Sequence, residues 1–394
     1  MYLAPDKYLV RQVRDEAAKL SVATTDDPHD PTFLAERAVL VTNYYKLING
    51  KSVFGVVGDG REPIDLGIVD DAHAALATTE DQFRLRVSAS HESYQKLLDL
   101  FAVDLQHQSA NAWAELTDKD PTALAPIPFW AWADKKVRVM EILHPHRFDD
   151  ALKFAWPLIA EVLHLCTATA TTKAVEIRPS CPPIDRIPSF VRARRRVNLT
   201  ATLSDDSALV TDLDAAPSLV ARPVTPGCAA DLGDRMILAP VALNPELDSE
   251  AVRQPARQFA DGDRDGDGVA EDKPVNVVVL VPSERAAAAW ENYADRTYRV
   301  GDLVVGVKEL QADHVGVVVL VNKYHGVDLP ADACRLLILD GIPRPLDAVE
   351  RREAVALADS SVRLAREVTV RRVRRRRQPG PRHEGPAGRS GVGR

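Results

Sequence analysis

The 394-residue chain has only four cysteines, and no apolar run approaches the roughly 20 residues that cross a bilayer. The cysteines lie far apart, at positions 166, 181, 228 and 334, and form no Cys-x-x-Cys pair. Reduced thiols in or near a core are therefore expected, not a zinc or iron–sulfur site. The N-terminus also lacks the form of a signal peptide. These absences predict a cytoplasmic protein with no membrane partner.

Basic charge is sparse except at one end of the chain. Residues 371–394 contain nine arginines and one glutamate, whereas the whole chain has a net charge of −7, so the remainder is strongly acidic. An acidic body does not exclude nucleic-acid binding, but total charge gives no support for it. The arginine, proline and glycine of residues 366–394 cannot bury a core, so a disordered basic tail is predicted. An alternative is that this segment is read outside the native coding frame.

The length exceeds what one hydrophobic core serves and predicts two or three domains. Apolar runs typical of buried strands alternate with segments of helical spacing, which predicts an α/β fold with mostly parallel sheets. Strands are expected at 38–42, 66–70, 197–202, 275–281, 315–322 and 336–340, and helices at 7–20, 43–48 and 283–295.

Residues 75–165 differ, because their apolar residues recur at helical spacing and prolines interrupt the middle. We expect a helical insertion here. Trp130 and Trp132 within it are either a platform for stacking bases or, as base rates favour, helix-packing residues. The predicted organisation is a first lobe at 1–210 with this insertion, a second lobe at 211–365, and the tail at 366–394.

The apolar run 66–70 ends in Asp70-Asp71-Ala72-His73. Ligands of open α/β sheets lie at the carboxyl ends of the strands. An Asp at such an end can hold Mg²⁺ through water, and a neighbouring acid can orient or deprotonate an attacking water. The His can report the state of a phosphate to a neighbouring domain. The plainer interpretation of these four residues alone is a polar turn after a strand.

A glycine-rich loop that cradles phosphate is missing. Gly50-Lys51-Ser52 is the nearest match to the end of Gly-x-x-x-x-Gly-Lys-Ser/Thr, but Tyr45 occupies the first glycine position and the preceding residues are helix-like. Without that loop no nest of backbone amides forms.

The acidic stretch from Asp261 has the spacing of a calcium loop. Its acids are Asp261, Asp263, Asp265, Asp267 and Asp272, with glycine at the sixth position. A strand instead of a helix is expected after it, and Asp instead of Glu closes it. A solvated linker between a helix and a strand is therefore the alternative to a Ca²⁺ site.

Taken in order, several short segments resemble the DEAD/DEAH-box helicases of superfamily 2, and most of all bacterial members with a degenerate DEAH box. Residues 2–12 are similar to motif Ia, and Leu40-Val41-Thr42-Asn43 to the next backbone-contacting motif. Asp70-Asp71-Ala72-His73 stands where the family has Asp-Glu-Ala-His, and Thr200-Ala201-Thr202 resembles motif III. Residues 277–283 resemble motif IV, and residues 319–330 resemble motif V.

The resemblance implies two RecA-like lobes and assigns roles to individual residues. Asp70 would hold Mg²⁺ through water and Asp71 would act on the attacking water, although Asp for Glu shortens the reach by one methylene. Gly326 and Asp328 would serve the nucleotide and couple the lobes. The remaining assignments are Thr200 and Thr202 to coupling, His73 to the catalytic motif, and Pro5, Gln12, Thr42 and Asn43 to nucleic acid.

The implied activity is ATP- and Mg²⁺-dependent movement along single- or double-stranded DNA or RNA. The P-loop would lie before Met1 and the last arginine-finger motif is not recognisable, so the chain is expected to be a fragment with little or no ATPase activity alone. Two alternatives remain. One is a non-catalytic RecA-like binding module whose P-loop comes from a separate chain. The other is a calcium-regulated adaptor built on the Asp261 loop.

Overall fold

The computed structural model describes residues 1–57, 64–200, 207–224, 236–263, 265–299, 301–322, 327, 329–341, 347–349 and 351–352, without the side chains of residues 73 and 242. These residues form two compact units. Unit 1 contains the described residues up to 224 together with those of 347–352, and unit 2 contains the described residues from 236 to 341.

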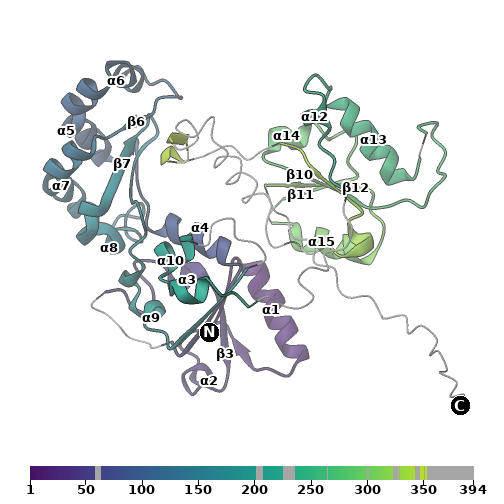
Figure 1. Ribbon diagram of the computed structural model, residues 1–394, viewed down its shortest axis with the longest axis horizontal. Helices are drawn as coiled ribbons and strands as arrows, with labels where there is room; N and C mark the ends of the chain where they lie inside the picture. Colours follow the sequence, from purple (N-terminus) through teal and green to yellow (C-terminus); the bar gives the residue numbers. More distant parts are fainter. Residues whose placement is uncertain are drawn as a thin grey trace, which may run out of the picture. The chain divides into compact units, whose positions relative to one another are not determined.

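Unit 1 is built on a parallel sheet of order β2-β3-β1-β4-β9. Its strands are short and their inner members are apolar, as expected of strands covered by helices. They span Tyr2–Ala4 (β1), Thr24–Thr25 (β2), Val39–Asn43 (β3), Leu66–Asp70 (β4) and Arg195–Leu199 (β9). The accompanying helices are α1 (Lys7–Lys19), α2 (Pro31–Leu34), α3 (Tyr44–Leu47), α4 (Ala72–Gln82), α10 (Ser207–Leu213) and α11 (Pro217–Val220). The first helix, α1, packs beside β3 (Figure 1).

The segment between β4 and β9 carries an antiparallel sheet as well as helices. Its strand order is β5-β8-β7-β6, and α5, α6 and α7 pack on it (Figure 1). The strands span Leu85–Ser88 (β5), Ala125–Pro126 (β6), Cys166–Ala170 (β7) and Ala174–Pro179 (β8). The helices span Glu92–Gln108 (α5), Ala110–Thr117 (α6), Phe129–Leu143 (α7), Trp156–Ile159 (α8) and Pro188–Val191 (α9), with 3₁₀ turns at His144–His146 (η1), Ala160–Leu165 (η2) and Ile184–Arg186 (η3).

One hydrophobic core serves both sheets of unit 1. A single cluster of buried side chains runs from Leu3 on β1, through Val69 on β4 and Leu85 on β5, to Leu213 on α10. Trp132 belongs to it: its indole donates to the carbonyl of Leu163 at 2.8 Å and its ring stacks on Phe101. Trp132 is therefore a packing residue, as the base rate favoured. The insertion does not fold around a separate core.

Asp347, Ala348 and Arg351 make hydrogen bonds to other residues of unit 1. The Arg84 guanidinium donates to Asp347 at 2.6 Å, and the backbone N–H of Ala348 donates to the buried carboxylate of Glu176 at 2.8 Å. Arg351 adds a hydrogen bond to the carbonyl of Thr122 at 2.6 Å. The second lobe was expected to extend to residue 365, whereas these described contacts are with the segment of unit 1 between β4 and β9.

Unit 2 contains a parallel sheet of order β11-β12-β10-β13 that is covered on both faces. Alternate residues of β10 and β12 pack on α15 and on α13 with α14, so both strands read as continuous apolar runs. The strands span Val277–Val281 (β10), Arg296–Tyr298 (β11), Val317–Val321 (β12) and Leu336–Leu339 (β13). The helices span Pro240–Leu243 (α12), Glu250–Asp261 (α13), Glu284–Ala288 (α14) and Leu303–Ala312 (α15), with a 3₁₀ turn, η4, at Ala331–Ala333.

The predicted α/β class, with a parallel sheet in each unit, is confirmed. The helix expected at 283–295 does begin after an N-cap at Ser283, whose hydroxyl accepts from the N–H of Ala286, but it ends at Ala288. The insertion was expected to be helical, and its antiparallel sheet was not foreseen. Among the described residues no helix has the length and apolar character needed to cross a bilayer. The predicted basic tail lies outside the described residues.

Candidate functional site

The strand ends of the first parallel sheet gather the predicted site residues along one edge. The register pairs Ala4 with Asn43 and Asp70 with Leu199, so the carboxyl ends of β1, β3, β4 and β9 coincide. Residues that directly follow aligned parallel strands share that edge. The edge therefore carries Pro5 after β1, Asn43 at the end of β3, the acids after β4, and Thr200 after β9.

Asp70 and Asp71 are half-buried, and neither carboxylate has a hydrogen bond or an ion pair with the side chains the structure describes. Asp71 lies at the N-cap of α4 with φ 57° and ψ 75°, in the left-handed region, and its side chain does not cap the helix. This backbone conformation is unfavourable for a residue with a Cβ and is often found at functional sites. The Asp71 side chain therefore does not make the stabilising hydrogen bond to a backbone N–H that an N-cap acid usually makes.

Tyr44 lies beside the acid pair. Its hydroxyl donates to the backbone carbonyl of Asp71 at 3.2 Å, and its ring is fully buried. Burial raises the pKa of Tyr44, and the negative charges of Asp70 and Asp71 raise it further. The tyrosine therefore stays neutral and fixes the turn between β4 and α4 through its hydroxyl. Sequence reasoning missed this residue, which starts α3.

The residues assigned to nucleic acid occupy different environments. Thr42 is buried in β3, and Asn43 uses its side chain to accept from the N–H of Lys46, which caps α3. Pro5 and Gln12 are half-buried, the first between β1 and α1 and the second within α1. Pro5, Thr42 and Asn43 lie at or near the strand ends of this edge, with β1 between β3 and the acid-bearing β4, whereas Gln12 lies further along its helix.

Several predicted residues cannot be placed. The backbone of His73 lies in α4, but its side chain is outside the described part of the structure, as are Thr202, Gly326 and Asp328 entirely. Their assigned roles stay predictions.

Gly50-Lys51-Ser52 packs against the backbone and the ring of Phe154. It follows α3 and not a strand, and the N–H of Gly50 donates to the carbonyl of Phe154 at 2.8 Å. A Cβ at Gly50 would lie 2.3 Å from that carbonyl oxygen, so glycine is required by the close approach of two backbones. The Lys51 ammonium lies over the Phe154 ring. These residues therefore form a packing contact and not a phosphate cradle.

The acidic stretch in unit 2 follows α13 and precedes β10, as expected. Arg257 donates to both carboxylate oxygens of Asp261, which keeps the pKa of that acid below its ordinary value. A group of carboxylates that lie within 4.8 Å of one another forms further along, from Asp263, Asp265, Asp267 and Glu271. Of the five predicted calcium ligands, the structure brings three together; Asp261 pairs with the helix, and Asp272 lies outside the group.

Comparisons with known proteins add little to this geometry. No family model and no curated protein matches the chain. Among solved structures, S. tokodaii Xpd4 is 11% identical with a TM-score of 0.48, over 93% of this chain and 80% of that one. A structure titled XPD helicase is 12% identical with a TM-score of 0.37, over 92% and 70%.

The residues at this edge fit a hydrated Mg²⁺ better than they fit ATP. Two neighbouring carboxylates without a described counter-charge supply the oxygen ligands that Mg²⁺ prefers. The phosphates of a nucleotide also need a cluster of backbone amides or cationic side chains. Gly50-Lys51-Ser52, the nearest match to a phosphate-binding loop in the sequence, is committed to its contact with Phe154.

Proposed function

We propose that this chain is the core of a nucleic-acid-dependent ATPase of the superfamily 2 helicase type, with two RecA-like lobes and little or no ATPase activity alone. The proposal places it in the cytoplasm, acting on DNA or RNA. The observation that carries it is the pair Asp70 and Asp71 at the carboxyl edge of a parallel sheet, where neither carboxylate has a described partner and Asp71 holds a left-handed backbone.

The two acids have distinct tasks in this proposal. Asp70 ends β4 and is held by the sheet, which suits a group that positions Mg²⁺ through water. Asp71 begins α4, where the helix dipole favours its negative charge, and would orient the attacking water. When bound, Mg·ATP would supply the phosphoryl group. Asp71 reaches one methylene less far than the family's Glu, and misplacement of a reacting group slows such chemistry.

The neighbouring polar residues would serve nucleic acid and coupling. Thr200 and Thr202 follow β9 and would couple hydrolysis to movement, while His73, Gly326 and Asp328 keep the roles that the resemblance implies. Pro5, Gln12, Thr42 and Asn43 would lie along the nucleic-acid backbone, where strand ends and the N-terminus of α1 offer polar contacts. Thr42 would act through its backbone, since its side chain is buried.

A second candidate is a non-catalytic RecA-like module that binds nucleic acid and obtains its P-loop from another chain. It is favoured by the commitment of Gly50-Lys51-Ser52 to packing, since this segment then does not serve as a phosphate-binding loop. Both candidates predict binding to single-stranded nucleic acid, and they differ in hydrolysis.

A nucleic-acid-stimulated ATPase assay on the purified chain tests the first proposal. We expect a weak, Mg²⁺-dependent rate that Asp70→Asn abolishes and that Asp71→Glu raises, because Glu restores the reach of the family residue. Asp65→Asn is the matched control, since this exposed acid precedes β4 and should leave the rate unchanged.

Each outcome assigns a function. A rate that persists in Asp70→Asn would place hydrolysis elsewhere and refute the assignment. Binding of a labelled oligonucleotide with no hydrolysis in any variant would favour the non-catalytic module. Turnover near one per second in the unmodified chain would contradict the expectation of a weak ATPase.

A further inference from the structure

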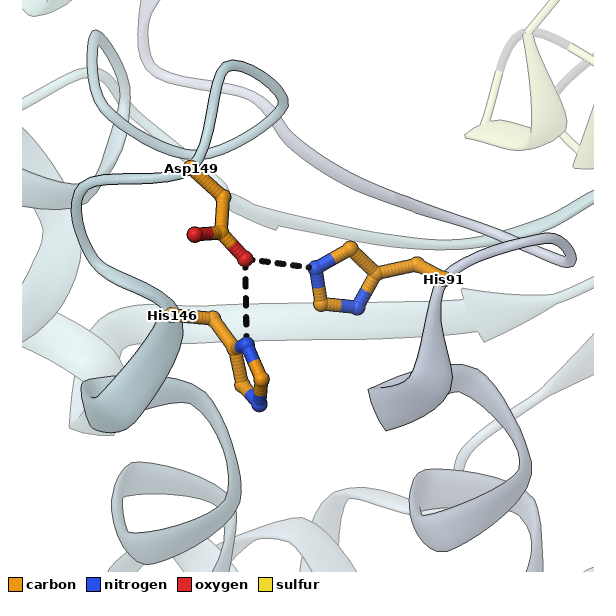
Figure 2. Close-up of side chains that lie close together, drawn as sticks. All are labelled: His91, His146 and Asp149. Atoms are coloured by element: carbon orange, nitrogen blue, oxygen red, sulfur yellow. Dashed lines mark hydrogen bonds and ion pairs between the residues drawn. The ribbon is translucent and has the colours of Figure 1, made fainter.

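Two histidines and an aspartate meet in the insertion of unit 1, away from the strand ends described above. His91 is the N-cap of α5, His146 ends the 3₁₀ turn η1 after α7, and Asp149 lies in the turn that follows. The imidazoles are largely buried, with side-chain exposures of 13% and 17%, while Asp149 is 47% exposed. Figure 2 shows both rings directed at one oxygen of Asp149.

The three side chains are spaced as ligands of one ion would be. Asp149 Oδ2 lies 3.2 Å from Nε2 of His91 and 3.0 Å from Nδ1 of His146, and all the ligand atoms lie within 4.8 Å of one another. In a tetrahedral zinc site, bonds of about 2.0–2.1 Å place neighbouring ligand atoms roughly 3.3 Å apart. Small adjustments of the rings would therefore admit a metal ion.

Both ring nitrogens of His146 face carboxylate oxygens, but a neutral imidazole can donate to only one of them. Nδ1 faces Asp149, and Nε2 lies 2.8 Å from Oε1 of Glu92. A neutral imidazole has only one N–H, so one nitrogen would direct a lone pair at a carboxylate. A cation between Nδ1 and Asp149 removes this conflict, and Nε2–H then donates to Glu92. That is the carboxylate–histidine–metal arrangement that orients metal-binding imidazoles.

His91 must lose its hydrogen bond with Ser93 in order to coordinate a metal ion. Its Nδ1 accepts from the backbone N–H of Ser93 at 3.2 Å, so the proton of a neutral ring sits on Nε2. Coordination through Nε2 moves this proton to Nδ1 and gives up the bond to Ser93. That bond is long and partly exposed, so its loss is minor against a metal–nitrogen bond.

We propose that His91 Nε2, His146 Nδ1 and the Asp149 carboxylate bind one divalent ion of the zinc class, with water as fourth ligand and Glu92 supporting His146. Two imidazoles select transition metals over Ca²⁺ and Mg²⁺. The ion would join the start of α5 to the end of α7, across 58 positions of the chain. The role is structural and independent of the ATPase proposal.

Titration of the full chain with Zn²⁺, after treatment with a chelator, tests the site. Calorimetry should show one strong Zn²⁺ site and thermal unfolding of unit 1 should shift upward with Zn²⁺. His91→Asn should remove that site while keeping a helix cap, since Asn is a preferred N-cap residue. His146→Gln and Asp149→Asn should also remove it, and Glu92→Gln should weaken it about 10–100-fold.

His107→Asn is the matched control, because this exposed histidine lies in the last turn of the same helix and should leave binding unchanged. Circular dichroism of each variant confirms that it is folded. Strong Zn²⁺ binding that survives in folded His91→Asn and His146→Gln would assign the ion to another group, such as the exposed thiol of Cys181, and overturn the proposal. No Zn²⁺ binding to the unmodified chain would overturn it equally.

Discussion

Replacing Asp71 tests whether the turn between β4 and α4 is strained for function. Asp71 holds φ 57° in the left-handed region, and its own side chain makes no cap hydrogen bond; the one described contact at the turn is the Tyr44 hydroxyl on the Asp71 backbone carbonyl, which every substitution of Asp71 keeps. For a residue with a Cβ this conformation costs roughly 1–2 kcal/mol, whereas glycine adopts it freely. We therefore expect Asp71→Gly to be more stable than Asp71→Ala, the reverse of the usual order.

The magnitude follows from two opposing terms. Glycine recovers about 1–2 kcal/mol of backbone strain but costs roughly 0.5–1 kcal/mol in chain entropy. Asp71→Gly should thus lie between no change and about 1.5 kcal/mol of added stability. Asp71→Ala retains the backbone strain, so no stability is gained from its relief. Both variants lose the carboxylate, so any Mg²⁺-dependent hydrolysis should disappear while stability is kept or gained.

Urea unfolding of unit 1, followed by tryptophan fluorescence, measures the difference. Four of the five tryptophans, at positions 113, 130, 132 and 156, lie in this unit. Lys119 is the control, since it is exposed and has φ 60° outside the site, so Lys119→Gly should also be more stable than Lys119→Ala. Destabilisation by more than about 1 kcal/mol in Asp71→Gly would show that the carboxylate makes a stabilising contact and would refute the reasoning.

Three further predictions follow from single contacts. Asn276→Ala should destabilise unit 2 by about 2–4 kcal/mol in urea unfolding, because its buried amide bonds three carbonyls and two backbone N–H groups that would lose their partners. Gly50→Ala should lower the melting temperature of unit 1 without changing Mg²⁺ binding, since its Cβ would collide with Phe154; unchanged stability would contradict the packing role. In alkylation mapped by mass spectrometry at mildly alkaline pH, exposed Cys181 should react before buried Cys166. Burial raises the pKa of Cys166 to about 12, so its thiolate forms only well above that pH, and early labelling of Cys166 would contradict its burial.

The central strands of both parallel sheets could be predicted because they are short apolar runs bounded by polar residues, whereas the edge strands β2 and β11 were not predicted. The run at 275–281 became β10 at Val277–Val281, and the run at 315–322 became β12 at Val317–Val321. The antiparallel sheet was missed because β7, Cys-Thr-Ala-Thr-Ala, contains no large apolar residue, although its two threonines favour a strand. Its burial comes from helices packed on it, which a local pattern does not reveal.

The candidate site was partly predictable for the same reason. A strand that ends in two acids places them at a sheet edge, and the register then brings Asn43 and Thr200 to that edge. Tyr44 could not be found, since its contact with Asp71 joins residues 27 positions apart. The group of His91, His146 and Asp149 likewise has no local motif, because only the packing of α5 against α7 brings it together.

Mn²⁺ binding followed by electron paramagnetic resonance tests most directly whether the strand-end acids hold a divalent ion, with Mn²⁺ in place of Mg²⁺. The account predicts saturable binding that Asp70→Asn removes and that a variant of the acidic loop, Asp265→Asn with Asp267→Asn, leaves intact. Equal binding by the unmodified chain and by Asp70→Asn would contradict the claim that the carboxyl end of β4 is the functional centre of unit 1.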